Sequence, residues 1–141
     1  MAPTGEVADL RFETDARLSA DEVNAAYAWA EWPQREAWRI EAASHRSTWI
    51  AARMPDGDLA GIVRLLDDGG LYASVWDLLV RPDWRRRGVG TRLVQMALEA
   101  CRDRRLVVLV STPMARPLFD RLGFDTESHG HAALYLRPYR S

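Results

Sequence analysis

The feature that most constrains the fold is a glycine-containing loop between a strand-like segment and a helical one. The apolar stretch "LYASVWDLLV" (71–80) is followed by the loop "RPDWRRRGVG" (81–90). Beyond the loop, apolar residues recur at helical spacing at Leu93, Val94, Ala97, Leu98 and Cys101. The continuous apolar run "LVVLV" (106–110) is typical of a strand covered on both faces. Strand, helix and buried strand in this order predict a right-handed crossover between parallel strands.

A meander of antiparallel strands is predicted before this crossover. The strand-like stretches "STWIAAR" (47–53) and "LAGIVRLL" (59–66) precede the stretch 71–80. The connections "MPDGD" and "DDGG" carry Pro, Asp and Gly, the residues that tight turns require. Short turns of this kind make the three strands antiparallel neighbours.

The N-terminal part adds a strand and two helices. The stretch "EVADLRF" (6–12) predicts a first strand. Ser19 and Glu22 form an S-x-x-E capping box for a helix over 18–30. Pro33 suits the first turn of a second helix, over 33–43.

The C-terminal part is expected to complete the sheet. "PMARPLFDRL" (113–122) predicts a short helix that ends at Gly123, and "FDTESHG" (124–130) with "AALYLRP" (132–138) predicts a last pair of strands. The expected fold class is α/β (α+β). One domain over residues 1–141 would hold a mixed sheet, antiparallel first and parallel in the middle, with helices on both faces.

Composition excludes several classes of function. All 19 basic residues are arginines and the formal net charge is −1, which argues against nucleic-acid binding. A single cysteine forbids an intramolecular disulfide, as in a reducing cytoplasm. The sequence shows neither a signal-peptide core nor a run of about 18 apolar residues, so we expect a cytoplasmic protein with no membrane partner.

The loop itself has the chemistry of an anion site. Backbone N–H groups at a helix start are free and carry partial positive charge, and glycines let the backbone curl around an anion. Arginines add charge-assisted hydrogen bonds to phosphate. The sequence lacks the P-loop pattern, and a dinucleotide fingerprint would need glycine where Leu93 stands. The pattern that remains is R-x-x-G-x-G at Arg85, Gly88 and Gly90.

Two blocks of the sequence resemble the GCN5-related N-acetyltransferase (GNAT) family. "DLLVRPDWRRRGVGTRLVQMAL" is similar to the family's acyl-CoA signature V-x-P-x-[YW]-[RQ]-x-x-G-x-[GA], with Arg85, Gly88 and Gly90 in the [RQ], G and [GA] places. "LVVLVSTPMARPLFDRLGF" resembles the later strand and helix of the family, which end in "LGF". The resemblance covers nearly the whole chain and implies a small bacterial member.

The resemblance implies a place for acetyl-CoA. The backbone amides of residues 86–91 would hold the pyrophosphate, with Arg85 beside them. Residues 78–80 would pair with the pantetheine like another strand, and the two parallel strands would splay apart in a V. Backbone N–H groups there would polarise the thioester carbonyl. The residues expected at the cofactor are Leu78, Leu79, Val80, Arg85, Arg86, Arg87, Gly88, Val89, Gly90, Thr91, Thr112 and Phe119.

A base is expected because an alkylamine has a pKa of roughly 10 and is mostly protonated near neutral pH. Asp77 is the first candidate, since many relatives carry an acidic residue on this strand. Strand alternation would turn only one of Trp76 and Asp77 toward the cleft. His129 and His131 are the other candidates, in the last hairpin, which borders the acceptor site in relatives. No further ligand cluster accompanies them, so no metal is expected.

Phe119 departs from the family pattern. Relatives place a tyrosine here as general acid, and phenylalanine cannot donate a proton. The thiol that leaves has a pKa of about 8.5, so a thiolate can leave with the help of water, which Ser111 or Thr112 would hold. The sequence therefore predicts either a slower step or a protein that binds acyl-CoA without rapid turnover.

The implied function is acetyl-CoA-dependent N-acetylation of a small-molecule amine by direct attack on the thioester. Trp29, Trp32 and Trp38 cluster in the two N-terminal helices and suggest an aromatic-lined pocket for an aromatic or apolar amine. The alternatives are a peptide or protein N-terminal acetyltransferase and an acyl-CoA-binding or sensing domain with weak catalysis. The expected assembly is a monomer or a homodimer.

Overall fold

A five-stranded mixed sheet forms the centre of the molecule. The computed structural model describes residues 5–138. The strands are β1 (Arg11–Ala16), β2 (Thr48–Arg53), β3 (Leu59–Asp67), β4 (Tyr72–Val80) and β5 (Leu106–Leu109), adjacent in sequence order. Strands β1 to β4 pair antiparallel, and β4 pairs with β5 in parallel. The mixed sheet and the meander expected from the sequence are therefore confirmed.

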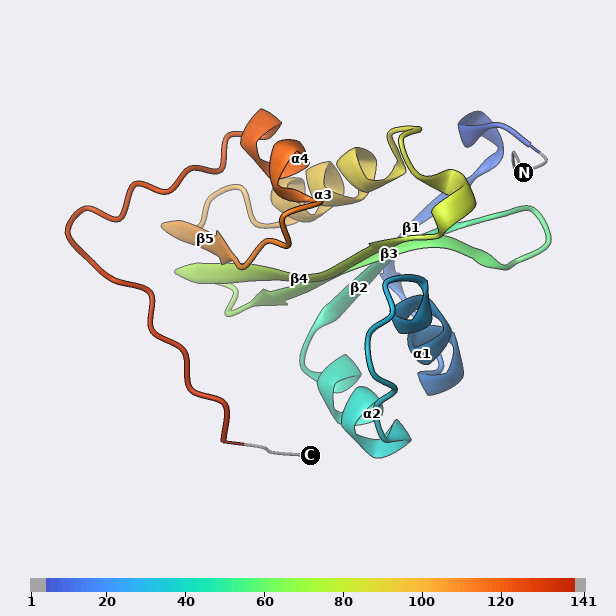
Figure 1. Ribbon diagram of the computed structural model, residues 1–141, viewed down its shortest axis with the longest axis horizontal. Helices are drawn as coiled ribbons and strands as arrows, with labels where there is room; N and C mark the ends of the chain where they lie inside the picture. Colours follow the sequence, from blue (N-terminus) through green and yellow to red (C-terminus); the bar gives the residue numbers. More distant parts are fainter. Residues whose placement is uncertain (1–4, 139–141) are drawn as a thin grey trace.

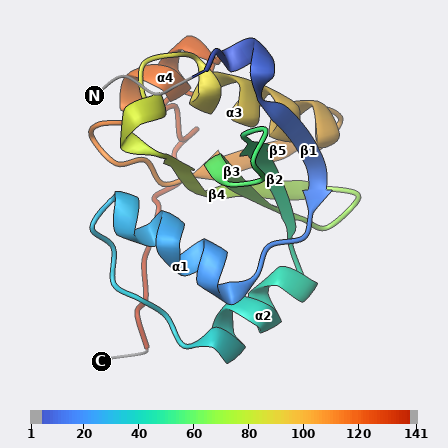
Figure 2. The ribbon, with the colours of Figure 1, turned by 90° about the vertical axis from the view of Figure 1, so that its right-hand side faces the viewer.

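Helices cover both faces of this sheet (Figures 1 and 2). The helices are α1 (Ala20–Trp29), α2 (Ala37–His45), α3 (Val89–Ala100) and α4 (Arg116–Arg121), with 3₁₀ turns η1 (Val7–Asp9) and η2 (Pro82–Trp84). α1 and α2 lie on one side of the sheet and α3 and α4 on the other. Ser19 Oγ accepts a hydrogen bond from Glu22 N, and Glu22 Oε1 accepts one from Ser19 N. The predicted capping box is thus confirmed.

The two sides of the sheet carry separate apolar cores. Side chains on successive strand residues point to opposite faces. In β2, Ile50 packs toward α3 with Leu93, whereas Ala51 packs toward α1 with Val23. Both clusters are almost fully buried and fix α3 and α1 against the sheet from opposite sides.

Two N-terminal boundaries differ from the prediction. Strand β1 begins at Arg11, because Asp9 accepts a hydrogen bond from Glu6 N and closes a 3₁₀ turn over part of the expected strand. Helix α2 begins at Ala37 instead of at Pro33. The side chain of Asn24 bonds both the N–H and the carbonyl of Arg35 and holds that segment extended.

The C-terminal part differs most from the prediction. Gly123 follows α4 with a φ of 96°, as expected of a helix stop. The described residues 124–138, however, contain no strand, so the expected last pair of strands is wrong. As a result β5 lies at the edge of the sheet, and the prediction that residues 106–110 are covered on both faces is wrong too. Sequence pattern indicated which residues are apolar, but not which surface would cover them.

Candidate functional site

The parallel strands β4 and β5 separate toward the carboxyl end of β4. Their pairing runs only from Tyr72, opposite Leu106, to Val75, opposite Leu109. Residues 76–80 of β4 pair with β3 alone. The expected V-shaped splay is present, and it leaves this end of β4 with an open edge beside α3 and α4.

A bulge reorients β4 at the mouth of the splay. Ile62 pairs with Leu79 and Arg64 pairs with Trp76, so Asp77 and Leu78 lie opposite a single residue of β3. Asp77 has a φ of 52°, a conformation that costs energy for a residue other than glycine. A bulge re-aims side chains and frees a backbone group from the ladder.

Beyond the bulge, the alternation of β4 side chains between the two faces of the sheet is shifted by one residue. Val75 packs toward α3, whereas Leu79, four residues later, packs with the core on the α1 side. The side chain of Asp77 contacts Tyr27 of α1, and Trp76 lies opposite Arg64, which contacts the same carboxylate. Trp76 and Asp77 thus share one face, and the expectation that only one of them turns toward it is wrong.

The loop between η2 and α3 is the candidate anion cradle, and two of its residues are left-handed. Arg86 and Gly88 have φ values of 62° and 86°, whereas Arg85 has a φ of −67°. Arg85 is extended, with a ψ of 154°, and the left-handed residues after it turn the chain sharply into α3. No side chain caps α3, and its first internal bond runs from Arg92 N to the carbonyl of Gly88. The N–H groups of the first turn are therefore available to an anion.

The two glycines of this loop serve different purposes. A Cβ added to Gly88 would meet no atom within 4 Å, so the space in front of the helix start is open and the need for glycine is the positive φ. A Cβ added to Gly90 would come within 3.1 Å of Leu118 Cδ1. Gly90 therefore allows α4 to pack closely on α3.

The arginine side chains of the loop are mostly engaged within the protein. Arg85 donates from Nε to the carbonyl of Val80 and from Nη2 to the carbonyl of Trp29, at 3.2 and 3.0 Å. Arg87 lies over the ring of Trp84 and donates to the carbonyl of Gly5. Among the arginines of this loop, Arg86 alone is exposed and forms no described side-chain hydrogen bond. The groups of this loop that remain available to an anion are therefore mainly backbone N–H groups. Arg85 connects the loop to β4 and α1.

Asp77 lies in a polar cluster on the α1 side of the sheet. Its Oδ2 accepts a hydrogen bond from Arg64 Nε at 2.8 Å and one from the hydroxyl of Tyr27 at 3.3 Å. The ion pair with Arg64 is largely shielded from solvent. Burial, and next the charge of Asp77, raises the pKa of Tyr27 to about 12, so this phenol stays protonated near neutral pH.

Arg64 and Tyr27 are the members of the site that sequence patterns missed. Arg64 is the only charged residue in the apolar stretch "LAGIVRLL", and a charge there needs a partner. The lone charge in this stretch therefore marks Arg64 as a candidate for a buried ion pair. Tyr27 lies on a helical face that also packs the core, and nothing in its spacing distinguishes it from a packing residue.

The structure does not bring the histidines to Asp77. His129 and His131 lie in residues 125–138, which run away from the sheet (Figure 1). Both are exposed, and their contacts are local: His129 Nδ1 lies 4.0 Å from Glu127 Oε1, and His131 Nδ1 lies 3.1 Å from the carbonyl of Ser128. Within residues 5–138 no contact joins either ring to Asp77.

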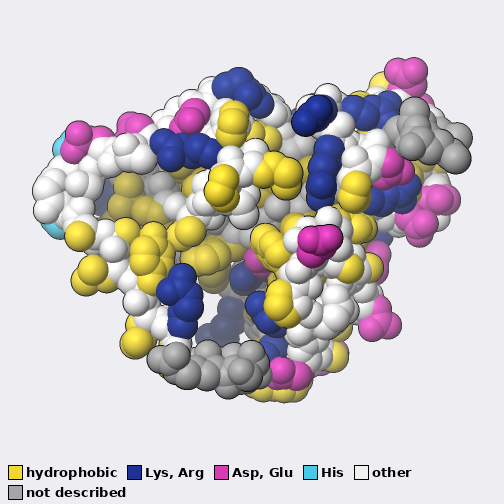
Figure 3. Space-filling view, in the orientation of Figure 1, with side chains coloured by type: hydrophobic (Ala, Val, Ile, Leu, Met, Phe, Trp, Pro, Cys, Tyr) yellow, Lys and Arg dark blue, Asp and Glu magenta, His cyan; other side chains and the backbone are white. Residues whose placement is uncertain are grey.

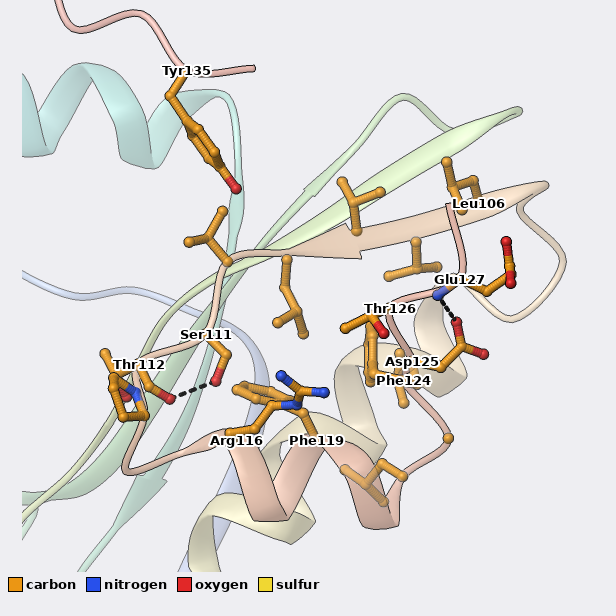
Figure 4. A pocket seen from close by; sticks show the side chains of 18 residues that line it. Leu106, Ser111, Thr112, Arg116, Phe119, Phe124, Asp125, Thr126, Glu127 and Tyr135 are labelled. Atoms are coloured by element: carbon orange, nitrogen blue, oxygen red, sulfur yellow. Dashed lines mark hydrogen bonds between the residues drawn. The ribbon is translucent and has the colours of Figure 1, made fainter. Parts of the chain in front are cut away.

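Phe119 and Thr112 line a hollow of about 990 Å³ between β5, α4 and the segment that follows α4 (Figure 4). The buried ring of Phe119 packs edge-on against Phe124, with 5.7 Å between the ring centroids. Thr112 accepts a hydrogen bond from Ala115 N on its side chain, and Ser111 Oγ donates to the carbonyl of Thr112. The two hydroxyl residues expected to hold water thus lie at the same hollow as Phe119.

The three N-terminal tryptophans do not form one pocket wall. The ring of Trp32 packs against Tyr27, with 5.7 Å between centroids, and Trp29 is partly buried beside it. Trp38 is exposed and lies under Arg39. Tyr27, Trp29 and Trp32 therefore pack together on the α1 side of the sheet, the side on which Asp77 contacts Tyr27.

Cys101 is a buried member of the α3 core. Its thiol donates to the carbonyl of Ala97 at 3.3 Å, and burial raises its pKa. Between residues 5 and 138, no group of three or more His, Cys, Asp or Glu side chains could hold a metal ion. None of the helices in that range has the length and apolar character needed to cross a membrane.

The splayed strands and the glycine loop before α3 lie together at one end of a mixed sheet that helices cover on both faces. A family model described as Acetyltransferase (GNAT) family matches residues 14–124, and the chain belongs to this family. The resemblance noted in the sequence is thereby confirmed. Members of the family use acetyl-CoA as cosubstrate.

Several curated proteins are similar to the chain. The uncharacterised N-acetyltransferase ycf52 of Pyropia yezoensis is 23% identical over 113 residues, 76% of this chain and 65% of that protein. Histone acetyltransferase TAP1 of Glycine max is 22% identical over 149 residues, 96% of this chain and 64% of that protein. The chain thus spans just under two thirds of the length of these two relatives.

Solved structures share the fold over nearly their full length. A protein from Deinococcus radiodurans R1 is 28% identical with a TM-score of 0.77, covering 98% of this chain and 94% of that chain. A GNAT-family acetyltransferase from Streptococcus pneumoniae TIGR4 is 23% identical with a TM-score of 0.78, covering 94% and 99%.

Proposed function

We propose that the chain is an acetyl-CoA-dependent N-acetyltransferase whose acceptor is the amine of a small molecule. The observation that carries the proposal is the backbone cradle of residues 85–91 at the mouth of the splayed strands. Its uncapped helix start and the open space in front of Gly88 support the proposal, because free N–H groups at a helix N-terminus favour an anion.

Different residues of the cleft are proposed to bind different parts of acetyl-CoA. The amides of residues 86–91 would bind the pyrophosphate, and the open edge of β4 at residues 78–80 would bind the pantetheine. When bound, acetyl-CoA supplies a thioester carbonyl that an amine attacks directly. Backbone N–H groups freed near the bulge at Asp77 would stabilise negative charge on an oxygen placed there.

Asp77 is proposed to hold the acceptor nitrogen. Arg64 and Tyr27 both contact Oδ2, which fixes the orientation of the carboxylate. A carboxylate held in one orientation can accept a hydrogen bond from the acceptor amine. The sequence-based role of Asp77 as base, and those of His129 and His131, stay predictions.

Tyr27, Trp29 and Trp32 provide an apolar wall on the same side as Asp77. This arrangement favours an amine that carries an aromatic or other apolar group. A peptide or protein N-terminus is the second candidate acceptor, and the name of the Glycine max relative as a histone acetyltransferase supports testing it.

Two measurements test the proposal. Isothermal titration should show binding of acetyl-CoA and of CoA, and thiol release should then appear with members of a panel of aromatic and alkyl amines and peptides. Folded protein that binds neither ligand would overturn the assignment of the cradle. Binding without thiol release for any acceptor would favour an acyl-CoA-sensing domain.

Phe119→Tyr distinguishes slow catalysis from mere binding. A general acid contributes about 10² to 10⁴ in rate, less where the leaving group is already acidic, so we expect thiol release to rise by about tenfold or more. Phe124→Tyr, on the ring that packs against Phe119, is the matched control and should leave the rate unchanged. Equal rates in wild type and Phe119→Tyr would reject the idea of a missing acid.

A further inference from the structure

Strand β5 has the composition of an interior strand and the position of an edge strand. Its hydrogen bonds in the described sheet are to β4 alone. Leu106, Val108 and Val110 point to the face away from α3 and are 53%, 48% and 59% exposed. Natural edge strands carry charges, prolines or bulges that prevent pairing with another chain. Residues 106–110 carry none of these.

The apolar surface continues onto β4. Tyr72 lies opposite Leu106 in the register, and Trp76 lies further along the same face. Both are exposed, because α1 reaches β4 only near its carboxyl end, at Asp77 and Leu79. Figure 3 shows hydrophobic side chains gathered beside the opening that the C-terminal segment frames. A continuous apolar patch of this kind marks an interaction site.

The segment after α4 ends in a stretch whose composition is typical of a strand, although it forms no strand in the described structure. We call residues 125–138 the C-terminal arm. Leu134 and Leu136 are 90% and 87% exposed, and Tyr135 between them is exposed as well. The last part of the arm, residues 132–136, is apolar at every position and contains no helix or turn, yet none of the arm's described hydrogen bonds reaches the sheet.

The chain's own arm frames the space beside β5 and does not fill it. Residues 125–127 at the start of the arm, and Tyr135 further along, line the outer side of the hollow whose inner wall is residues 106–110 (Figure 4). The hollow is therefore open to a strand that enters between β5 and the start of the arm. The arm of another molecule is a strand with matching apolar faces.

We propose that two copies of the chain exchange their C-terminal arms, each arm adding to β5 of the other copy as an antiparallel strand. The register that pairs most apolar side chains sets Leu134 opposite Val108 and Leu136 opposite Leu106 on the bare face. Tyr135 then lies opposite Val107 on the α3 face. In a dimer with two-fold symmetry, the same exchange occurs twice, so both exposed β5 strands and both exposed arms are covered. This is the pattern of an isologous interface.

Cysteine pairs test the exchange directly. Directly opposite strand residues have Cβ atoms about 4.5–5.5 Å apart, close enough for a disulfide with a small adjustment. Val108→Cys and Leu134→Cys are made in separate, differently tagged chains that also carry Cys101→Ala, and the two chains are co-expressed and oxidised. We expect a disulfide-linked pair of about twice 16.0 kDa that carries both tags.

Val107→Cys with Leu134→Cys is the matched control, because Val107 lies on the opposite face, and it should not cross-link. The exchange is rejected if the Val108 and Leu134 chains stay separate. It is also rejected if one chain that carries both cysteines closes an internal disulfide as a monomer, since the arm would then cover its own β5.

A second measurement uses no cysteine. Light scattering of the intact chain should give about twice 16.0 kDa, and a chain that ends at Gly130 should give a monomer with unchanged circular dichroism. A monomeric intact chain, or a dimer that survives removal of the arm, contradicts the proposal.

Discussion

Gly88 combines two properties that no other residue supplies at the helix start. Its φ of 86° is left-handed, and the space in front of it is open for a ligand. An aspartate there would be strained and would place a negative charge where the pyrophosphate is proposed to bind. Two like charges about 4 Å apart repel by about 4 kcal/mol at an effective dielectric constant of 20.

We therefore expect Gly88→Asp to weaken CoA binding at least about 100-fold in isothermal titration. Gly57→Asp is the control, because Gly57 has a φ of 94° and open surroundings in the β2–β3 turn. It imposes similar strain far from the cradle and should leave the affinity unchanged. An equal loss in both variants would mean that strain, not charge at the cradle, decides binding.

Residue patterns predicted the cradle but not the cluster around Asp77. Gly88 and Gly90 stand out because few other residues tolerate a positive φ or a close helix contact. The contacts of Asp77 with Arg64 and Tyr27 depend on a bulge that the sequence does not mark. Strand alternation alone places Trp76 and Asp77 on opposite faces, and one extra residue in β4 is enough to reverse that.

Strand β4, the cradle and helix α1 are joined by the side chain of Arg85. It bonds the carbonyl of Val80 at the end of β4 and the carbonyl of Trp29 at the end of α1. Hydrogen bonds from charged groups contribute about 1.5–3 kcal/mol each, and less where water reaches them. Arg85 therefore holds three elements together, although the sequence pattern marks it as a contact of the cofactor.

We expect Arg85→Ala to lower the free energy of unfolding by about 2 kcal/mol in urea titrations. Arg86→Ala is the matched control, since Arg86 is its exposed neighbour and forms no described side-chain hydrogen bond. Its effect should stay within about 0.5 kcal/mol. If the two variants are equally stable, the bonds from Arg85 to Val80 and Trp29 do not stabilise the fold.

Helix α1 is tied to β2 by Glu22, which caps the helix and forms an ion pair with Arg53 at 2.8 Å. The hydrogen bond from Arg53 lowers the pKa of Glu22 below its ordinary value. A carboxyl whose pKa is lower in the folded state stabilises the fold above its unfolded pKa, which is about 4.3. That stabilisation is lost as the pH falls through the lower, folded pKa.

Glu22→Gln tests this dependence, because the amide oxygen of glutamine still accepts from Ser19 N and keeps the cap. Wild type should be the more stable protein at pH 6–7, and the difference should shrink as the pH falls below about 4 in urea unfolding. A difference that is constant from pH 7 to pH 3 would show that the charge of Glu22 does not act through Arg53.

Elements set by local signals were predicted well, and elements set by distant contacts were not. The cap at Ser19 and the turns between β2, β3 and β4 depend on neighbouring residues, and the structure has them as expected. The start of α2 depends on Asn24, eleven residues from the Arg35 backbone that it bonds. Residues 132–138 have strand composition, but their pairing depends on a partner surface that composition cannot specify.

The molecule as a whole separates its proposed cofactor cradle from its exposed apolar edge. The cradle lies between the end of β4 and the start of α3, whereas the edge is formed by β5 and the bare face of β4 (Figure 1). Residues 85–91 have no described side-chain contact with the C-terminal arm. Cofactor binding and arm pairing should therefore be separable by mutation.

Thermal unfolding with CoA tests this separation. A ligand at about 100 times its Kd stabilises the folded state by about 2.7 kcal/mol, which raises Tm by roughly 5–10 °C for a domain of this size. We expect that rise in wild type and in the chain that ends at Gly130, but not in Gly88→Asp. Removal of the arm changes the starting Tm only through the loss of the arm's own contacts, so the quantity compared is the CoA-dependent rise in Tm. Loss of the rise on removal of the arm would show that the arm forms part of the cofactor site, because the cradle residues themselves are intact in that chain.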